Sequence, residues 1–197
     1  MLKIGLTGGI ATGKSFVLNI FSKEGFFTVK ADEIAKKFYS ENKKLKEKLI
    51  KNFGNELYQK DKIDFKKIEE ILFNDPEERK KFEKIFYPEF EKFQDNFFKE
   101  LSKKHKTIVY ESALLFEVGT YKKFDILILT YCKRETQIKR ALERGISREK
   151  IEKILEHQID YERIIDKVDF SLNTDKSKKE TEREVLGIIK MIKRNNF

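Results

Sequence analysis

The N-terminal segment places a short apolar run directly before a glycine-rich turn. Residues 2–6 are mostly apolar and predict a strand, and a helix-forming stretch begins after the sequence Gly8-Gly9-Ile10-Ala11-Thr12-Gly13-Lys14-Ser15. This matches the pattern G-x-x-x-x-G-K-[ST], in which glycines let the backbone curl so that successive N–H groups converge on phosphate oxygens. The order of strand, loop and helix therefore indicates an α/β fold that binds a nucleoside triphosphate.

Each fixed position of this phosphate-binding loop has an expected role. Lys14 is expected to reach the β- and γ-phosphates, and Ser15 to offer its hydroxyl to Mg2+. The following helix begins where the loop ends, so its dipole and free N–H groups also favour an anion. With ATP as the phosphate donor, the residues of this segment expected to bind it are Gly8, Gly9, Ile10, Ala11, Thr12, Gly13, Lys14, Ser15 and Phe16.

The length and composition predict one globular domain, residues 1–197. The sequence predicts no metal site built from side chains. The net charge of +9 would suit a nucleic-acid binder, but the lysines are interleaved with glutamates along the chain, which predicts a solvated surface and no nucleic-acid partner. Cys132, His105 and His157 lack ligand spacing. We find neither a signal peptide nor a membrane-length apolar run and expect a cytoplasmic protein, with the oligomeric state left open.

Short β-branched or aromatic runs alternate with helical patterns along much of the chain. Such alternation predicts a three-layer P-loop NTPase fold, with helices on both faces of a five-stranded parallel sheet. The expected strands are Leu2 to Thr7, Phe26 to Val29, Thr107 to Tyr110, Phe124 to Tyr131 and Val168 to Leu172.

Between the second and third strands the chain is predicted to be helical, from residue 32 to residue 106, with no convincing strand. Asp75 before Pro76 is a strong helix start, because a capping residue precedes a proline in the first turn. Pro88 is expected to break the chain into a second helix. An insertion of this length predicts a helical substrate-binding subdomain.

The last third predicts three more helices. Glu135 to Arg144 and Ser147 to Gln158 are separated by Gly145, and Ser177 to Glu180 fits a capping box for a C-terminal helix. Arg140 and Arg144 share a helix face at i,i+4. In a small-molecule kinase such arginines belong to a lid that closes over the triphosphate, so residues 134–158 are the predicted lid segment.

Signatures of GTPases are missing from the sequence. No Asp stands three residues before a Gly, and residues 173–176 have the wrong order for a guanine-reading N-K-x-D motif. With 197 residues, a helical insertion and an arginine-rich late segment, the chain favours a small-molecule kinase over a switch protein, a motor or a transporter ATPase.

An ordered set of motifs gives a more specific interpretation. Beyond the loop, the motifs are Ala31-Asp32-Glu33-Ile34-Ala35, Phe53-Gly54, Asp75-Pro76-Glu77, Arg79, Tyr87-Pro88, Leu114-Leu115-Phe116-Glu117, Glu135-Thr136-Gln137, Ser147-Arg148-Glu149, Gln158 and Val168 to Asn173. In this set the chain resembles the dephospho-coenzyme A kinases, which phosphorylate the 3′-hydroxyl of dephospho-CoA in the last step of CoA synthesis. It departs from that pattern at Ala11 (usually Gly), Lys30 (commonly Asp), Tyr87 (usually His) and Ala113 (Pro). We expect Ala11 to need only an ordinary backbone conformation.

The resemblance implies roles for residues outside the loop. Asp32 would orient the 3′-hydroxyl for attack on the γ-phosphate, and Arg140 would act with Lys14 in catalysis. Arg144 and Asn173 would bind ATP. The residues implied in binding dephospho-CoA are Asp32, Arg79, Tyr87, Leu114, Leu115 and Phe116.

Simpler interpretations stay open for the same residues. Asp32 could cap a helix over Glu33 to Tyr39, and the arginines could lie on a solvated face. The 114–116 run could pack in the core, Asn173 could be a turn residue, and Arg79 and Tyr87 could cover the helical core. The alternative functions are a kinase of a nucleoside monophosphate or other metabolite, and a nucleic-acid-binding module.

Overall fold

The computed structural model describes residues 1–59 and 62–194. The chain divides into two compact units. One unit combines Met1–Ala31 with the chain from His105 onward, and the other is Asp32–Lys104. The first is called the sheet unit and the second the helical unit. In the part of the chain that the structure describes, no helix has both the length and the apolar character needed to cross a bilayer.

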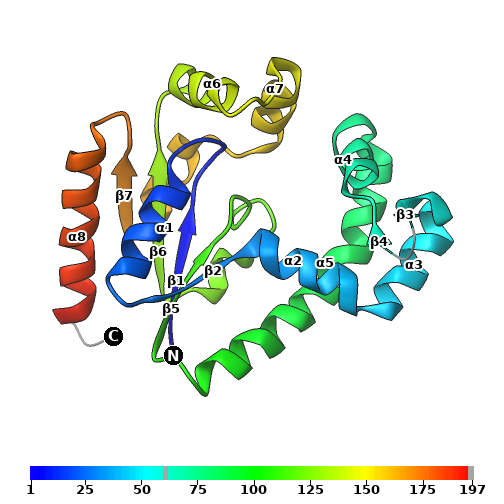
Figure 1. Ribbon diagram of the computed structural model, residues 1–197, viewed down its shortest axis with the longest axis horizontal. Coiled ribbons are helices and arrows are strands. Elements are labelled where there is room, and N and C mark those ends of the chain that lie inside the picture. The colour runs from blue at the N-terminus through cyan, green and yellow to red at the C-terminus, as the bar shows by residue number, and fades with distance from the viewer. Residues whose placement is uncertain (60–61, 195–197) are drawn as a thin grey trace. The chain divides into compact units, whose positions relative to one another are not determined.

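The sheet unit is built on five parallel strands, which confirms the predicted fold class (Figure 1). The strands are β1 (Leu2–Thr7), β2 (Phe27–Lys30), β5 (Thr107–Glu111), β6 (Ile126–Tyr131) and β7 (Phe170–Asn173). Their order is β2-β5-β1-β6-β7, so β1 lies at the centre. Because all strands run in the same direction, the loop that follows β1 lies at the carboxyl edge of the sheet, where ligands bind in open α/β folds.

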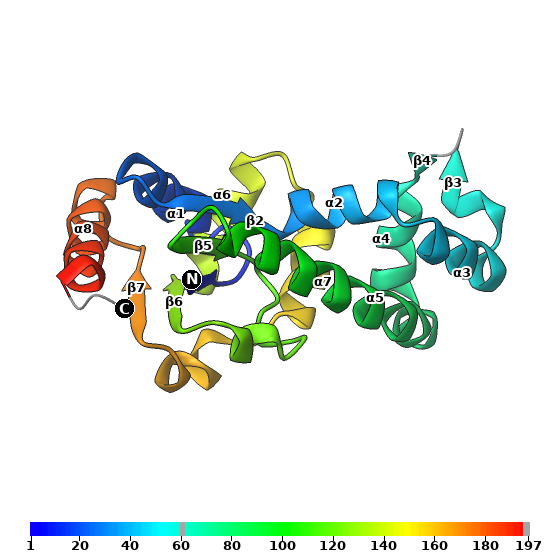
Figure 2. The same cartoon turned by 90° about the horizontal axis from the view of Figure 1, so that it is seen from below.

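Helices α1 (Lys14–Lys23) and α8 (Lys178–Arg194) cover one face of this sheet (Figures 1 and 2). The apolar residues of α1 and α8 pack against alternate strand residues, as the period-2 pattern of a strand requires. The buried residues of this cluster are Ile4, Leu6, Val17, Leu18, Ile20, Phe21, Val109, Ile126, Ile128, Leu172, Val185, Ile188, Ile189 and Ile192. The two helices therefore turn their apolar residues toward the sheet.

The opposite face of the sheet is packed around Gly5. A Cβ at Gly5 would meet the side chains of Leu115, Phe124 and Leu127, each at 3.0 Å. Leu115 and Phe124 come from the segment between β5 and β6, which includes the short helix η2 (Thr120–Lys123). The largely irregular segment between β5 and β6 thus packs on this face of the sheet.

The predicted lid segment forms two helices of ten residues each, α6 (Arg134–Glu143) and α7 (Arg148–His157). Gly145 has a φ of 77° and separates them, as expected. Ser147 caps α7, because its Oγ accepts a hydrogen bond from Lys150 N at 3.3 Å. Two short helices, η3 (Tyr161–Arg163) and η4 (Ile165–Lys167), lead from α7 to β7.

The helical unit has its own aromatic-rich core. Its elements are α2 (Ala31–Glu41, whose first residue belongs to the sheet unit), α3 (Lys43–Phe53), η1 (Asn55–Leu57), α4 (Phe65–Asn74) and α5 (Pro76–Ser102). Phe38 and Leu45 are fully buried, and the Phe38 ring lies edge-on to that of Phe86, with the ring centroids 5.7 Å apart. This unit therefore buries its own hydrophobic cluster.

Two predictions for the helical unit are wrong. Strands β3 (Tyr58–Gln59) and β4 (Lys62–Ile63) pair in antiparallel fashion where no strand was expected. Pro88 does not end the helix, because α5, which is 27 residues long in all, continues through it. A proline removes the hydrogen bond to the carbonyl four residues earlier, here that of Lys84, and both Pro88 and Lys84 are exposed, so water can satisfy that carbonyl. The predicted start of α5 is confirmed, since Asp75 Oδ1 accepts hydrogen bonds from Glu77 N and Glu78 N.

Candidate nucleotide-binding site

The glycines of the loop allow a close approach to β6. Gly8 has a φ of 146°, and a Cβ there would lie 2.2 Å from the carbonyl oxygen of Thr130. Gly13 has a φ of 90° and precedes α1. A residue other than glycine would be strained at both positions, and at Gly8 it would also collide with the sheet backbone. The curl expected from the motif is present in the structure.

Lys14 and Ser15 stand at the N-terminus of α1, where the helix dipole favours negative charge. Lys14 Nζ donates hydrogen bonds to Gly8 O at 2.8 Å and to Gly9 O at 2.9 Å. Its charge is therefore held over the loop. Ser15 is exposed.

Ala11 has a φ of 56°, so the expectation of an ordinary backbone conformation is wrong. A left-handed conformation costs a residue with a Cβ about 1–2 kcal/mol. Ala11 is 5% exposed and packs with Ala141 of α6 and Ile151 of α7. Burying its methyl group, at about 0.8 kcal/mol per carbon, offsets part of the strain.

Replacing Ala11 by Gly is expected to change the melting temperature by less than about 3 °C. Relief of about 1–2 kcal/mol of strain is offset by about 0.4–1 kcal/mol for the freer unfolded chain and about 0.8 kcal/mol for the lost methyl contact. Ala141→Gly, at a fully buried position inside α6, is the matched control and should cost about 2 kcal/mol. Calorimetry would contradict the balance if both substitutions cost the same.

A cavity of about 310 Å³ lies beside the loop within the sheet unit. Its walls come from the loop and the start of α1, from α6 and its C-cap, from the turn that follows β7, and from the first turn of α8. The lining residues are Ala11, Gly13, Phe16, Arg140, Glu143, Arg144, Thr174, Lys176, Lys178 and Thr181. The structure therefore places Arg140 and Arg144 beside the loop, where both line the cavity. Arg144 is the exposed one of the two.

The guanidinium of Arg140 is already engaged in hydrogen bonds. Arg140 Nη2 donates to Thr174 O at 2.6 Å, and Arg140 Nη1 lies 3.1 Å from Thr174 Oγ1 and 3.5 Å from Ala11 O. Thr174 is 5% exposed, and its hydroxyl is within hydrogen-bond distance of Thr12 O (2.9 Å) and Tyr131 O (3.2 Å). Thr174 was missed in the sequence analysis. Its signal is its place directly after the last residue of β7, on the same edge as the loop.

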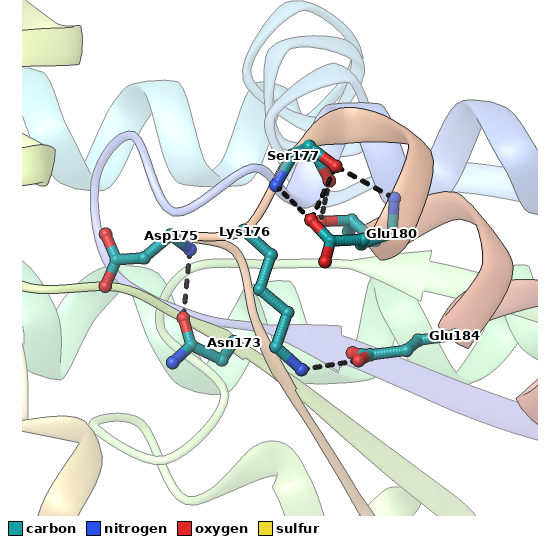
Figure 3. A network of polar contacts seen from close by, with 7 residues as sticks. Asn173, Asp175, Lys176, Ser177, Glu180 and Glu184 are labelled. Atoms are coloured by element: carbon teal, nitrogen blue, oxygen red, sulfur yellow. Dashed lines mark hydrogen bonds and ion pairs between the residues drawn. The ribbon is translucent and has the colours of Figure 1, made fainter.

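A polar network shapes the turn between β7 and α8 (Figure 3). Asn173 Oδ1 accepts a hydrogen bond from Asp175 N at 2.9 Å, the arrangement of an Asx turn. Ser177 Oγ accepts from Glu180 N at 3.3 Å while Glu180 Oε2 accepts from Ser177 N at 3.0 Å, which confirms the capping box. Asn173, the last residue of β7, thus shapes the following turn with its side chain and does not line the cavity.

Asp175 joins this turn to the start of α6. Its carboxylate accepts hydrogen bonds from Lys133 N at 2.9 Å and from Thr136 Oγ1 at 2.6 Å. Burial opposes ionisation, but these hydrogen bonds and the charges of Arg140 and Lys133 outweigh it and lower the pKa of Asp175. The lid segment is therefore fastened at its N-terminal end to the wall of the cavity.

A second, smaller cavity of about 80 Å³ lies between the beginning of the loop and the lid segment. It is lined in part by Gly9, Glu117, Gln137 and Gln158. Gln158 Oε1 accepts a hydrogen bond from Ile10 N at 2.7 Å, and Glu117 Oε1 accepts one from Ile159 N at 2.8 Å. Burial raises the pKa of Glu117, and the hydrogen bond from Ile159 and the charge of Lys14 oppose this rise without cancelling it.

The substitution Glu117→Gln should stabilise the protein increasingly as the pH rises. A carboxyl group whose pKa is raised by folding contributes stability below its unfolded pKa, near 4.5, and loses that contribution as the pH climbs through the folded pKa. A tenfold change in the acid dissociation constant on folding corresponds to about 1.4 kcal/mol. Urea denaturation between pH 4.5 and 8 measures the difference. Glu182→Gln, at an exposed position of α8, is the control and should follow the wild type.

The predicted run Leu114, Leu115 and Phe116 is split between core and surface. Leu115 is 1% exposed beneath Gly5, and Phe116 is 9% exposed and stacks on Tyr121 with the ring centroids 4.5 Å apart. Leu114 is 38% exposed. Packing explains Leu115 and Phe116, and Leu114 alone offers an open apolar surface.

The other predicted residues belong to the helical unit. Helix α2 begins at Ala31, so Asp32 lies in its first turn instead of capping a helix that starts at Glu33, as one interpretation had it. Arg79 Nε donates to Glu83 Oε1 at 2.8 Å. Tyr87 packs on Phe86, with the ring centroids 5.6 Å apart, at the edge of the aromatic core.

Comparison with known proteins places these features in one family. The family model described as dephospho-CoA kinase matches residues 2–180. A dephospho-CoA kinase of Fusobacterium nucleatum is 41% identical over 84% of this chain and 86% of that protein. A second, from Aquifex aeolicus, is 32% identical over 99% of this chain and all of that protein.

A solved structure agrees with the sequence comparisons. The structure of dephospho-CoA kinase from Campylobacter jejuni superposes with a TM-score of 0.74 and 32% identity, covering 99% of this chain and 98% of that one. The matching region includes both the phosphate-binding loop and the lid segment. With its glycine-rich loop after a central parallel strand, its lid helices and its sequence matched almost end to end, this chain belongs to the dephospho-CoA kinase family.

Proposed function

We propose that the protein transfers the γ-phosphate of ATP to the 3′-hydroxyl of dephospho-CoA and releases CoA and ADP. The observation that carries this proposal is the cavity beside the loop, lined by Arg140 and Arg144 of the lid segment, in a chain of the dephospho-CoA kinase family. Phosphoryl transfer depends mainly on positioning and on neutralising charge. The two substrates are small molecules, and we place the reaction in the cytoplasm because ATP is available there.

In the donor half, Lys14 and the loop N–H groups bind the β- and γ-phosphates, and Phe16 and Thr174 border the purine side. Arg140 lines the nucleotide cavity and holds the turn that carries Thr174. Arg144 is exposed at the end of α6, so we assign to its guanidinium the stabilisation of the negative charge on the phosphate during transfer. Asn173 shapes the same turn.

Mg2+ fits the residues at the start of α1. Ser15 offers an exposed neutral oxygen beside the phosphate-binding loop. Over the described ranges, 1–59 and 62–194, no group of three or more His, Cys, Asp or Glu side chains forms a metal cage. Mg2+ ordinarily keeps several waters and shares substrate phosphates with one or two protein ligands, and Ser15 would be such a ligand. Bound there, it would neutralise charge on the phosphates.

In the acceptor half, Asp32 accepts the hydrogen bond of the 3′-hydroxyl and orients it for in-line attack. This role follows from its match to the Asp of the family motif, Ala31-Asp32. Arg79 and Tyr87 of the helical unit contact substrate phosphate or its neighbourhood, and Leu114 contacts the pantetheine arm or the adenine. Leu115 and Phe116 support this segment from the core.

A coupled ADP-release assay across several acceptors tests the proposal. Dephospho-CoA, AMP, CMP, dTMP and shikimate are each added to the enzyme with ATP and Mg2+, and dephospho-CoA alone should stimulate ADP release. Mass spectrometry of the product should show one phosphate added to dephospho-CoA. Stimulation by another acceptor, without stimulation by dephospho-CoA, would assign the protein to a different substrate.

A further inference from the structure

The backbone N–H of Ile10 and the carbonyl oxygen of Ala11 both contact side chains of the lid segment. Ile10 N donates to Gln158 Oε1 at 2.7 Å, and Ala11 O lies 3.5 Å from Arg140 Nη1. Between these two contacts Ala11 has its left-handed φ of 56°. A conformation that is unfavourable for alanine persists only where the surroundings determine it, and here the surroundings are α6 and the residue that follows α7.

Gln158 is itself held in place by its neighbours. The next residue, Ile159, donates its N–H to Glu117 Oε1 at 2.8 Å. Leu155, one turn earlier, packs against the buried cluster of Ala11, Ala141 and Ile151, as Ile10 does. The end of α7 is therefore anchored at two points beside the loop.

The contact between Gln158 and the loop is tight. A Cβ at Gly9 would lie 3.2 Å from Gln158 Oε1 and 2.9 Å from Gln137 Nε2. Because Ile10 N–H is a donor, the atom of Gln158 that faces it must be the amide oxygen, which fixes the orientation of the side chain. The amide oxygen thus has one defined acceptor role.

We propose that Gln158 is a positioning residue for the phosphate-binding loop. Its amide oxygen holds Ile10 N–H, and this keeps Ala11 in the left-handed conformation that the phosphate-binding form of the loop requires. The inference rests on the proposed function to the extent that the loop binds the phosphates of ATP or ADP. Glycine adopts the same conformation without strain, so a loop with glycine at position 11 needs the contact less.

The test is a double-mutant cycle measured by calorimetric titration with ADP and Mg2+. Gln158→Met keeps the length of the side chain and removes the acceptor, and it should weaken ADP binding about five- to tenfold, as expected for one lost hydrogen bond. In the Ala11→Gly background the same substitution should weaken binding by less than about twofold. Recovery by glycine at position 11 is a result that a purely structural role of Gln158 does not produce.

Three controls make the outcome decisive. Glu156→Met, at an exposed position of α7 two residues before Gln158, should leave ADP affinity unchanged. Thermal melting of each variant separates loss of folding from loss of binding. If Gln158→Met does not fold, Gln158→Asn, whose amide is one carbon too short to reach, takes its place in the cycle.

The inference would be overturned if Gln158→Met weakened ADP binding equally in the wild-type and Ala11→Gly backgrounds. It would also be overturned if Gln158→Met did not weaken ADP binding at all. ADP binding does not involve the acceptor. A wild-type protein that shows the predicted cycle but does not phosphorylate dephospho-CoA would therefore refute the proposed acceptor and leave the role of Gln158 intact.

Discussion

Replacing Asp32 by Asn is expected to lower kcat for dephospho-CoA by about 10²–10⁴, the range typical for loss of a positioned acid or base. Asparagine keeps the size of the side chain but removes the charge that accepts a hydrogen bond from the 3′-hydroxyl. The KM for ATP should change little, because the residues proposed to bind ATP are on the loop and the lid segment. Steady-state assays with varied dephospho-CoA and fixed, saturating ATP provide the measurement.

The matched control is Glu33→Gln, which removes a carboxylate from the adjacent exposed residue of α2. This variant should retain the wild-type rate, since Glu33 has no proposed role in the reaction. Both acids lie in the first turn of α2, so both substitutions remove a similar helix-dipole interaction, worth about 0.3–1 kcal/mol. Equal rates for Asp32→Asn and the wild type would remove Asp32 from the mechanism and leave only its helix-stabilising role.

The substitution Lys14→Met should abolish most activity by acting on the phosphates of the donor. We expect kcat/KM for ATP to fall about 10³-fold, at the upper end for loss of one preorganised donor, because a full positive charge is removed as well. ADP binding should weaken in parallel. Isothermal titration and ADP-release assays measure the two effects separately.

Lys23→Met, at the other end of α1, serves as the control for charge and helix propensity, and it should leave both quantities unchanged. Lys14 also donates to the carbonyls of Gly8 and Gly9, so its loss could loosen the loop. Lys14→Arg separates the two effects: it keeps the charge on a different, planar group. If Lys14→Met bound ADP as tightly as the wild type, the proposed phosphate contact would be contradicted.

Much of the sheet unit could be predicted from local patterns, since each strand is a short apolar run bounded by turns and each lid helix has clear end signals. Leu2–Thr7 is predicted to the residue, and the capping box at Ser177 is present. Local patterns are sufficient here because hydrophobic periodicity and caps act within a few residues.

The errors occur where distant contacts decide the conformation. The left-handed backbone at Ala11 depends on residues such as Gln158 and Arg140, which are more than a hundred positions away in sequence. Pro88 is tolerated inside α5 because Lys84 and Pro88 stay exposed in the folded helical unit, so water can satisfy the Lys84 carbonyl. The role of Thr174 likewise arises from three chain segments that meet only in the folded sheet.

The central position of β1 has a consequence for the order of folding. Leu2 pairs with Thr107, and Ile4 with Ile126, so during synthesis β1 finds its neighbours only after about 100 further residues have been made. Closing a loop of that length costs about 4 kcal/mol of chain entropy beyond a constant term. The helical unit contains contacts that are closer in sequence and should gain structure first. Its early compaction would shorten the effective loop between β1 and β5, which makes the inserted helices a folding aid for the sheet.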